Sequence, residues 1–370
     1  MKSSRRIFIK RTFLGASFIV LSNPFKQLWA LTKNTPSIPP SWKELVEIAR
    51  WCPTVHNLQP HQVKIISETE AELFYNPERL LPVEDPDSIF TTIAIGVFIE
   101  NLSIAAAPFG YKVIIDHLYD SISIKSLKPT LFAKLKLVSN SEKEVLNEKL
   151  IVKRRTSRVH YDGKRLNENT IQRIKKESEK FGHDFFHSSE KDIVDFVITL
   201  NEETLFEDLG SKPTRDELDR LFRYNKKEAE FHKDGLWTKC MGFSGHLTRS
   251  IFKNHAKWTK GFYKKLLKKH YMSTFKGTNT ICWFGGVFNQ TDDWIQCGRM
   301  LARNWLIMTD ENAYIQPFGS LITNKNAYSK IKAKLNQPDK PKKIWMIFRA
   351  GYSKTPTRSY RLSTNEILIK

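Results

Sequence analysis

The chain has 370 residues, with 60 lysines and arginines against 39 aspartates and glutamates, and a formal net charge of +21 at pH 7. Because a single hydrophobic core seldom serves more than about 250 to 300 residues, we expect two lobes. The charge favours anionic partners, but it is spread along the chain without a recognisable nucleic-acid module, which argues against a nucleic-acid-binding protein. Most of the lysines are expected to form a solvated surface.

The N-terminal segment has the pattern of an export signal. Arg5 and Arg6 precede an apolar run at 12–21, about half of the roughly 20 residues that span a bilayer as a helix. The pattern resembles the twin-arginine signal, an address read by the twin-arginine translocation machinery. It predicts a signal peptide over 1–30 and a periplasmic or otherwise exported protein. The resemblance implies folded cargo, often carrying a cofactor. A basic terminus with a chance arginine pair is the alternative.

After a proline-containing linker, local signals predict one helix and one hairpin. Ser41 and Glu44 form a capping box, and the apolar residues behind them recur at helical spacing, so an amphipathic helix should run to Pro53. Two strand-like runs, 63–67 and 71–75, are close enough in sequence to pair as a hairpin.

Two later segments read as long buried helices. Residues 89–109 are apolar nearly all the way round and end at Gly110, a residue suited to a left-handed helix cap. A second segment aligns with the first so that Gly298 matches Gly96 and Asn312 matches Gly110. The match suggests an internal duplication whose two central helices pack together in one chain. Two unrelated buried helices are the alternative.

The segment between these helices is more polar. It contains a basic turn at 153–164, helical runs at 168–181 and 192–206, and an irregular, charged and aromatic stretch at about 207–277. We interpret the last stretch as an insertion that forms a lid over the core. A buried strand is expected at 344–348, followed by a tail that carries several arginines.

Three clusters carry chemistry. Residues 153–158 combine three arginines with two hydroxyl side chains just before a helix, a set suited to a phosphate because guanidinium groups bind its oxygens bidentately. The loop at 52–61, fixed by two prolines, suits the polar edge of a flat heterocycle. Arg349 and Arg358 in the tail could add charge for the same phosphate.

With these residues the chain resembles the nitroreductase family of flavin enzymes. Residues 52–60 are similar to the family's A-P-S-x-x-N-x-Q-P element, and 154–158 to its R-R-S-x-R phosphate motif. In the ordinary family the arginine motif comes first and two subunits share each FMN. The reversed order here resembles a fused, pseudo-dimeric, Acg-like branch. The resemblance implies an α+β fold with two similar lobes, 31–150 and 151–370, mixed or antiparallel sheets around central buried helices, and a monomer with one flavin site.

The resemblance also implies site residues and partners. The FMN phosphate and ribityl chain would contact Arg154, Arg155, Thr156 and Arg158, helped by Arg349 or Arg358; the ring would face Pro53, Thr54 and Asn57, with Pro317, Phe318 and Gly319 in a loop over it. The partners are a small-molecule electron donor and acceptor. Since the flavin carries the redox chemistry, no acid or base is obligatory and the catalytic residues stay unknown.

Other assignments follow from what the sequence lacks. The histidines show no metal-ligand spacing, so no metal site is expected. Cys52, Cys240, Cys282 and Cys297 are too far apart for a C-x-x-C site and are expected to be buried free thiols. Two functional alternatives stay open: a protein that sequesters flavin without turnover, and a basic peripheral protein that contacts an anionic membrane or wall polymer.

Overall fold

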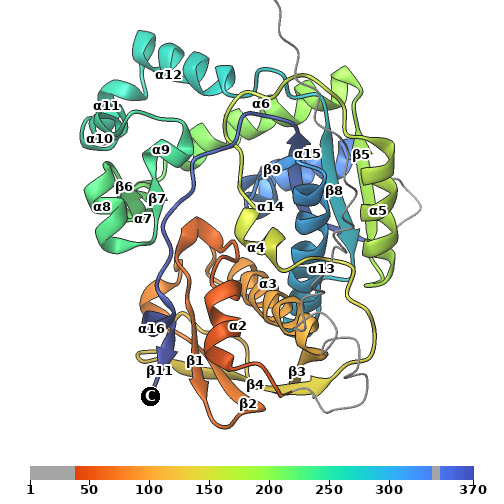
Figure 1. Cartoon of the computed structure of the whole chain (residues 1–370). Coiled ribbons are helices and arrows are strands. Elements are labelled where there is room, and N and C mark those ends of the chain that lie inside the picture. Colours follow the sequence, from red (N-terminus) through yellow and green to blue (C-terminus); the bar gives the residue numbers. More distant parts are fainter. Residues whose placement is uncertain (1–37, 336–341) are drawn as a thin grey trace, which may run out of the picture. The chain divides into compact units, whose positions relative to one another are not determined.

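The computed structural model describes residues 38–335 and 342–370; the expected signal peptide lies outside them. The chain folds into helices and mixed sheets, which confirms the α+β class (Figure 1). The elements of the first part are α2 (Trp42–Ala49), η1 (Val55–Asn57), β1 (His61–Ile65), β2 (Glu70–Tyr75), η2 (Pro77–Arg79), α3 (Ile89–Ala106), η3 (Ala107–Phe109), β3 (Tyr111–Leu118) and β4 (Thr130–Ser139).

The local signals at the start of this part act as expected. The capping box between Ser41 and Glu44 is present, but α2 ends at Ala49, before Pro53, because the chain turns at Arg50. The predicted hairpin forms from β1 and β2, two residues earlier than expected in its first strand. Both strands join a five-stranded sheet of order β11-β1-β2-β4-β3, in which only the β1–β11 pair is parallel.

The second part begins with more helices. Its elements up to the second long helix are α4 (Lys149–Lys153), α5 (Glu168–Glu179), β5 (Asp184–Ser188), α6 (Lys191–Asp208), α7 (Lys212–Leu221), β6 (Phe222–Arg223), α8 (Lys226–His232), β7 (Leu236–Trp237), α9 (Thr238–Met241), α10 (Gly245–Lys253), α11 (His255–Trp258), α12 (Gly261–Ser273) and β8 (Ile281–Gly286). The stretch read as a lid therefore consists mainly of short helices.

The chain closes with a second sheet and a returning tail. The last elements are α13 (Thr291–Asp310), β9 (Tyr314–Pro317), α14 (Ser320–Thr323), α15 (Lys325–Leu335), β10 (Lys343–Gly351), α16 (Thr364–Ile367) and β11 (Leu368–Ile369). Strands β5, β8, β10 and β9 form a four-stranded antiparallel sheet, and β10 is the buried strand expected at 344–348. After β10 the tail returns to the first sheet, where β11 pairs with β1 (Figure 1).

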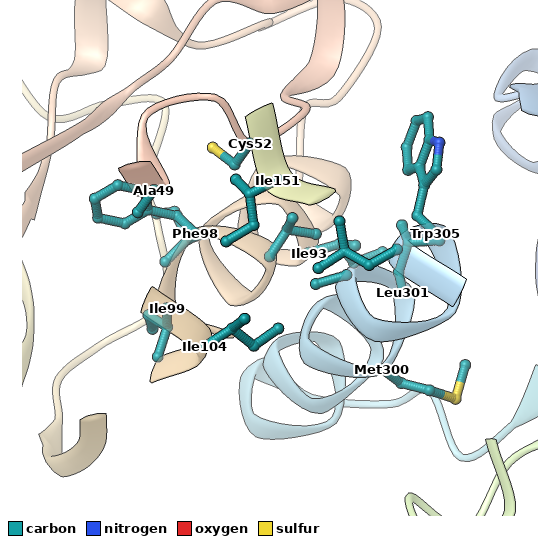
Figure 2. Close-up of a cluster of buried hydrophobic side chains, with 14 of the residues drawn as sticks. Ala49, Cys52, Ile93, Phe98, Ile99, Ile104, Ile151, Met300, Leu301 and Trp305 are labelled. Atoms are coloured by element: carbon teal, nitrogen blue, oxygen red, sulfur yellow. The ribbon is translucent and has the colours of Figure 1, made fainter. Parts of the chain in front are cut away.

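Helices α3 and α13 form the centre of the protein. Fifteen of the 18 residues of α3 are buried, as its all-round apolar sequence predicts. The segment Ile89–Phe109 is long and apolar enough to cross a membrane, but 83% of its 18-residue apolar window is buried inside the protein. Figure 2 shows Ile93 of α3 and Leu301 of α13 meeting in the cluster between the two helices.

The two helices approach most closely at the glycines that the sequence alignment pairs. A Cβ atom on Gly298 would lie 2.0 Å from the Ile93 carbonyl oxygen and 2.9 Å from the Cα of Gly96. One charged group is also shared: buried Glu100 of α3 accepts hydrogen bonds from Arg299 at 2.8 Å and Arg303 at 2.9 Å, both in α13. The left-handed caps expected at Gly110 and Asn312 are present, with φ of 79° and 57°.

Candidate functional site

A cavity of about 100 Å³ lies where four segments of the chain meet. Residues 51–57 follow α2, residues 154–158 follow α4, residues 235–241 comprise β7 and α9, and residues 357–361 belong to the tail. Eight of the predicted site residues line it together: Pro53, Thr54, Asn57, Arg154, Arg155, Thr156, Arg158 and Arg358. The structure therefore brings the two sequence motifs to one place, although they are separated by about a hundred residues.

The second sheet holds the arginine motif in position. Thr156 forms a bridge to Ile315 of β9, and the Ser157 amide donates a hydrogen bond to the Ile315 carbonyl at 3.1 Å. The Ser157 hydroxyl meets the Ser353 hydroxyl at 2.8 Å. Because its backbone is held in this way, the segment presents its arginine side chains to the cavity from a fixed edge.

Five arginines line the cavity, and we call them the cavity arginines: Arg154, Arg155, Arg158, Arg358 and Arg361. Within residues 38–335 and 342–370, none of them forms an ion pair with a carboxylate. Four of them bury an Nε atom without a hydrogen-bond partner, Arg158 being the exception. Buried positive charge without a counter-ion is costly, so this arrangement fits an anionic ligand that supplies the missing acceptors.

Two of the cavity arginines show this electrostatic cost most clearly. Burial, reinforced by the charge of Arg361, lowers the pKa of Arg154 to about 9. Burial also lowers the pKa of Arg361 to about 10. Arg154 is 7% exposed, its guanidinium lies 4.5 Å from the centre of the Trp305 ring, and it donates to the Trp51 carbonyl at 3.2 Å. It is therefore held in place by packing rather than by charge.

The opposite wall is a loop in an unusual backbone conformation. His56, Asn57 and Gln59 all have positive φ, at 46°, 60° and 54°. Residues with side chains adopt such angles at a cost of roughly 1 to 2 kcal/mol each, so the surrounding structure must enforce them. Hydrogen bonds of Gln59 hold the loop in this conformation. Its backbone N–H donates to the Thr54 hydroxyl at 3.0 Å, and its side-chain oxygen accepts from the Leu362 backbone N–H at 2.8 Å.

Asn57 is fixed and yet not fully satisfied. Its side-chain amide donates to the Tyr360 carbonyl at 3.1 Å, while its side-chain oxygen is buried without a hydrogen-bond donor. A buried acceptor of this kind normally has a partner. The free Oδ1 of Asn57 therefore suits the polar N–H edge of a ligand bound in the cavity.

Residues 235–241 form another wall of the cavity, and they lie within the stretch at about 207–277 that was interpreted from the sequence as a lid. Trp237 packs against Tyr360 of the tail, with ring centroids 5.5 Å apart, and Cys240 donates weakly to the Thr357 carbonyl at 3.6 Å. Gly235 begins the segment at φ 71°, and a Cβ there would lie 2.3 Å from the Leu221 carbonyl oxygen, so no other residue fits.

Four predicted cofactor residues lie outside this lining. Arg349 is fully buried in β10, where its guanidinium donates to Gln316 at 2.9 Å and to Thr278 at 2.9 Å. Pro317 ends β9, Phe318 packs in the core beneath the second sheet, and Gly319 precedes α14. Their proposed contact with a cofactor stays a prediction of the resemblance.

The structure adds lining residues that the motifs did not identify, chiefly Trp51, His56, Trp237, Cys240 and Arg361. Trp51 follows the C-cap of α2, and the Arg358 guanidinium lies over its indole ring, 4.3 Å from the ring centre. His56 pairs with Glu84 through Nε2. Arg361 stands in the arginine tail and His56 in the loop at 52–61, so both had a sequence signal. Trp51, Trp237 and Cys240 reach the cavity through tertiary packing.

Metal and thiol chemistry find no support among the described residues. No group of three His, Cys, Asp or Glu side chains could hold a metal ion there. All four cysteines are free thiols. Burial raises the pKa of Cys52 to about 12 and that of Cys240 to about 11, so neither is a ready nucleophile. The cavity can instead bind an anion at one end and a planar polar group at the other.

The comparisons with known proteins give distant structural neighbours. No protein-family model matches the chain, and no curated protein matches it by sequence. Among solved structures it is similar to the FMN-dependent nitroreductase NfnB from Mycobacterium smegmatis in complex with NADPH, at 16% identity over 59% of this chain and 95% of the other, with a TM-score of 0.33.

Two further structures match in the same range. A nitroreductase with bound FMN from Bacteroides fragilis has 12% identity over 60% of this chain and 97% of the other, with a TM-score of 0.35. A nitroreductase-like protein from Bacillus cereus has 12% identity over 62% and 96%, with a TM-score of 0.31. Similarity this distant gives no support to an assignment of function, which depends on the residues themselves.

Proposed function

We propose that the chain is an exported FMN-binding oxidoreductase of the nitroreductase type, built as a pseudo-dimer in one chain. The observation that carries the proposal is the cluster of cavity arginines, which lack counter-ions and face a buried unpaired acceptor on Asn57. FMN combines a phosphate dianion with a flat ring that has a polar N–H edge. The residues present therefore fit both of its ends.

Each wall would have its own task. The cavity arginines would hold the phosphate and ribityl chain, with Thr156 as an additional hydroxyl partner. Asn57 would accept a hydrogen bond from the ring edge, and the strained loop that carries it would keep that oxygen in position. When bound, FMN supplies hydride and electron transfer between a donor and an acceptor, both small molecules that we leave unnamed.

The volume of the cavity adds one requirement. About 100 Å³ is well below the roughly 300 Å³ at which small-molecule sites usually begin, so a whole FMN needs a wall to move. Residues 235–241 are the wall to expect, because Gly235 and Gly242 at its two ends have left-handed backbone angles that a glycine adopts without strain. The same enclosure favours a second candidate function, sequestration of flavin without turnover.

The spectrum of the purified protein tests the main proposal. We expect a yellow protein with near-stoichiometric flavin absorbance and release of FMN on denaturation. A colourless protein that cannot be loaded with FMN would falsify the proposal. If bound flavin is not bleached by any reductant under anaerobic conditions, the protein sequesters flavin instead.

A charge substitution tests the phosphate assignment. Arg158→Ala removes a guanidinium that has no hydrogen bond to the described residues, so the fold should be unaffected. Losing one charge-assisted contact of about 1.5 to 3 kcal/mol should weaken FMN binding about 10- to 100-fold. Riboflavin, which lacks the phosphate, should bind the variant and the wild type equally. A double variant with Arg154→Ala should lose FMN completely.

Arg165→Ala with Arg220→Ala is the matched control for the double variant. Both of these arginines are exposed, and replacing them removes the same charge from the protein. FMN binding should be unchanged in it. If riboflavin affinity falls as far as FMN affinity in Arg158→Ala, the phosphate is held elsewhere.

We also propose export by the twin-arginine pathway, from the Arg5-Arg6 pair and the short apolar run behind it. Replacing both arginines by lysine should retain the protein in the cytoplasm of a bacterium that has this pathway. Export of the lysine variant at the wild-type rate would show that another route is used.

A further inference from the structure

The segment that follows the cavity wall is unusually basic. From Gly235 to Thr291 the chain contains ten lysines and arginines and not one aspartate or glutamate, where the average composition would place about six acids. The segment includes α9 to α12, so its charge is concentrated on one group of neighbouring helices. The cavity arginines come from other parts of the chain. The basic segment and the cavity share only residues 235–241, which line the cavity.

Most of this charge is free on the surface. Arg249 pairs with Glu228 at 2.6 Å and Lys268 with Glu202 at 2.6 Å. In the part of the chain that the structure describes, the exposed lysines of α10 to α12 and their connections have no carboxylate partner: Lys253, Lys257, Lys260, Lys264, Lys265 and Lys269. These six lysines require an anionic partner from outside the chain if they are to be neutralised.

Helix α12 combines this charge with exposed apolar side chains. Its inner face is set by Tyr271 and Met272, which pack on the core cluster beneath the second sheet. On the opposite face Phe262 is 73% exposed and Leu266 is 47% exposed. They are four residues apart and therefore adjacent on the helix surface, beside Lys265 and Lys269, which follow at helical spacing.

An apolar centre flanked by lysines is the arrangement of a helix that lies in a membrane interface. Apolar side chains enter the acyl boundary while lysines reach the headgroups. A nucleic acid or a wall polymer would use the lysines but offers no apolar layer for Phe262 and Leu266. The presence of both kinds of side chain on one face separates these partners.

We propose that the outward face of α10 to α12, here called the cationic face, binds the surface of an anionic lipid bilayer. Its centre is Phe262 and Leu266 on α12, with the unpaired Lys265 and Lys269 beside them and the unpaired lysines of α10 and α11 near by. Binding is peripheral, because each helix is far shorter than the roughly 20 residues that span a bilayer. Helix α9 is itself part of the cavity wall and contacts α10, so the wall of residues 235–241 lies next to the membrane-bound face.

Co-sedimentation with lipid vesicles tests the proposal on the full chain. We expect binding to vesicles with about 30% phosphatidylglycerol in phosphatidylcholine, and none to pure phosphatidylcholine. The double variant Lys265→Gln, Lys269→Gln should bind about 25-fold more weakly, at roughly fivefold for each lysine. Phe262→Ser with Leu266→Ser should weaken binding at least about tenfold without changing the net charge.

Matched controls separate this face from the overall charge. Lys125→Gln with Lys128→Gln removes the same charge from exposed positions elsewhere, and Leu127→Ser removes a leucine that is 98% exposed. All three changes should leave vesicle binding nearly unchanged. An equal loss of binding in the lysine controls would overturn the proposal, because net charge alone would then explain it.

Two further outcomes would also overturn the proposal of bilayer binding. If the Phe262 and Leu266 variant binds vesicles as the wild type does, the face is only a solvated charged surface. If a polyanion such as heparin competes fully at low concentration and that variant has no effect, the partner is a polymer and not a bilayer. FMN absorbance should be unchanged in all the face variants, so failure here is distinguishable from failure of the flavin proposal.

Discussion

Replacing Gly298 by alanine should test whether the close approach of α3 and α13 is needed for the fold. The added Cβ would lie 2.0 Å from the Ile93 carbonyl oxygen, whereas ordinary contacts begin at 3.4 Å. Both atoms nearest to the new Cβ belong to the backbone of α3, so no side chain can rotate away. The two helices would have to separate by about 1.4 Å, and neither has free space around it.

The expected cost follows from two opposing terms. Overpacking of a core costs about 1 to 3 kcal/mol, and contact with backbone atoms places this site at the upper end. Alanine gains about 1 kcal/mol over glycine inside a helix, which offsets part of that cost. We expect the free energy of unfolding to fall by about 2 kcal/mol, measured by urea denaturation followed by circular dichroism with FMN present in excess.

Gly319→Ala is the control, because Gly319 has helical backbone angles and an added Cβ would meet nothing within 4 Å. That variant should be as stable as the wild type or slightly more stable. Wild-type stability in Gly298→Ala, or an equal loss in both variants, would refute the argument that the glycine contact sets the distance between the helices.

Two further predictions concern single buried groups. His61 is fully buried, has both ring nitrogens unpaired, and stacks on Phe98. Burial lowers the pKa of His61 to about 3, so the free energy of unfolding should fall as the pH drops below 6.5. Between pH 7 and pH 5 the wild type should lose about 2 kcal/mol more than His61→Phe, measured by urea titration at both pH values. Equal pH dependence in both proteins would contradict this. Cys240 lines the cavity whereas the other three thiols are buried, so a thiol reagent should modify only this cysteine of the native protein. The reaction should be slow because burial raises the pKa of Cys240 to about 11, and bound FMN should prevent it. Modification of two or more thiols before unfolding would contradict it.

The features that the sequence predicted well are encoded by neighbouring residues. The capping box at Ser41 and the left-handed caps at Gly110 and Asn312 depend on local backbone chemistry, and all three are present. The burial of α3 follows from its composition alone. In each case the competing structures differ within one or two helical turns, where sequence spacing is informative.

The site was harder to predict because similar arginines have different surroundings. Arg349 and Arg361 both stand in the basic tail, yet Arg349 is satisfied by Gln316 and Thr278 inside the second sheet while Arg361 keeps an unpaired Nε in the cavity. That difference follows from position: Arg349 lies within β10, whereas Arg361 lies in the irregular connection between β10 and α16. Residues 235–241 reach the cavity only through tertiary packing, and their apolar spacing gives no sign of it.

The route of the tail has a consequence for the order in which the protein can be assembled. Residues 357–361 form one wall of the cavity, and β11 completes the first sheet beside β1, near the other end of the described chain. The wall therefore cannot exist until residues 357–361 have been made and folded back onto the cavity. Any ligand of this cavity must enter after that step, and a nascent chain that still lacks this segment should hold none.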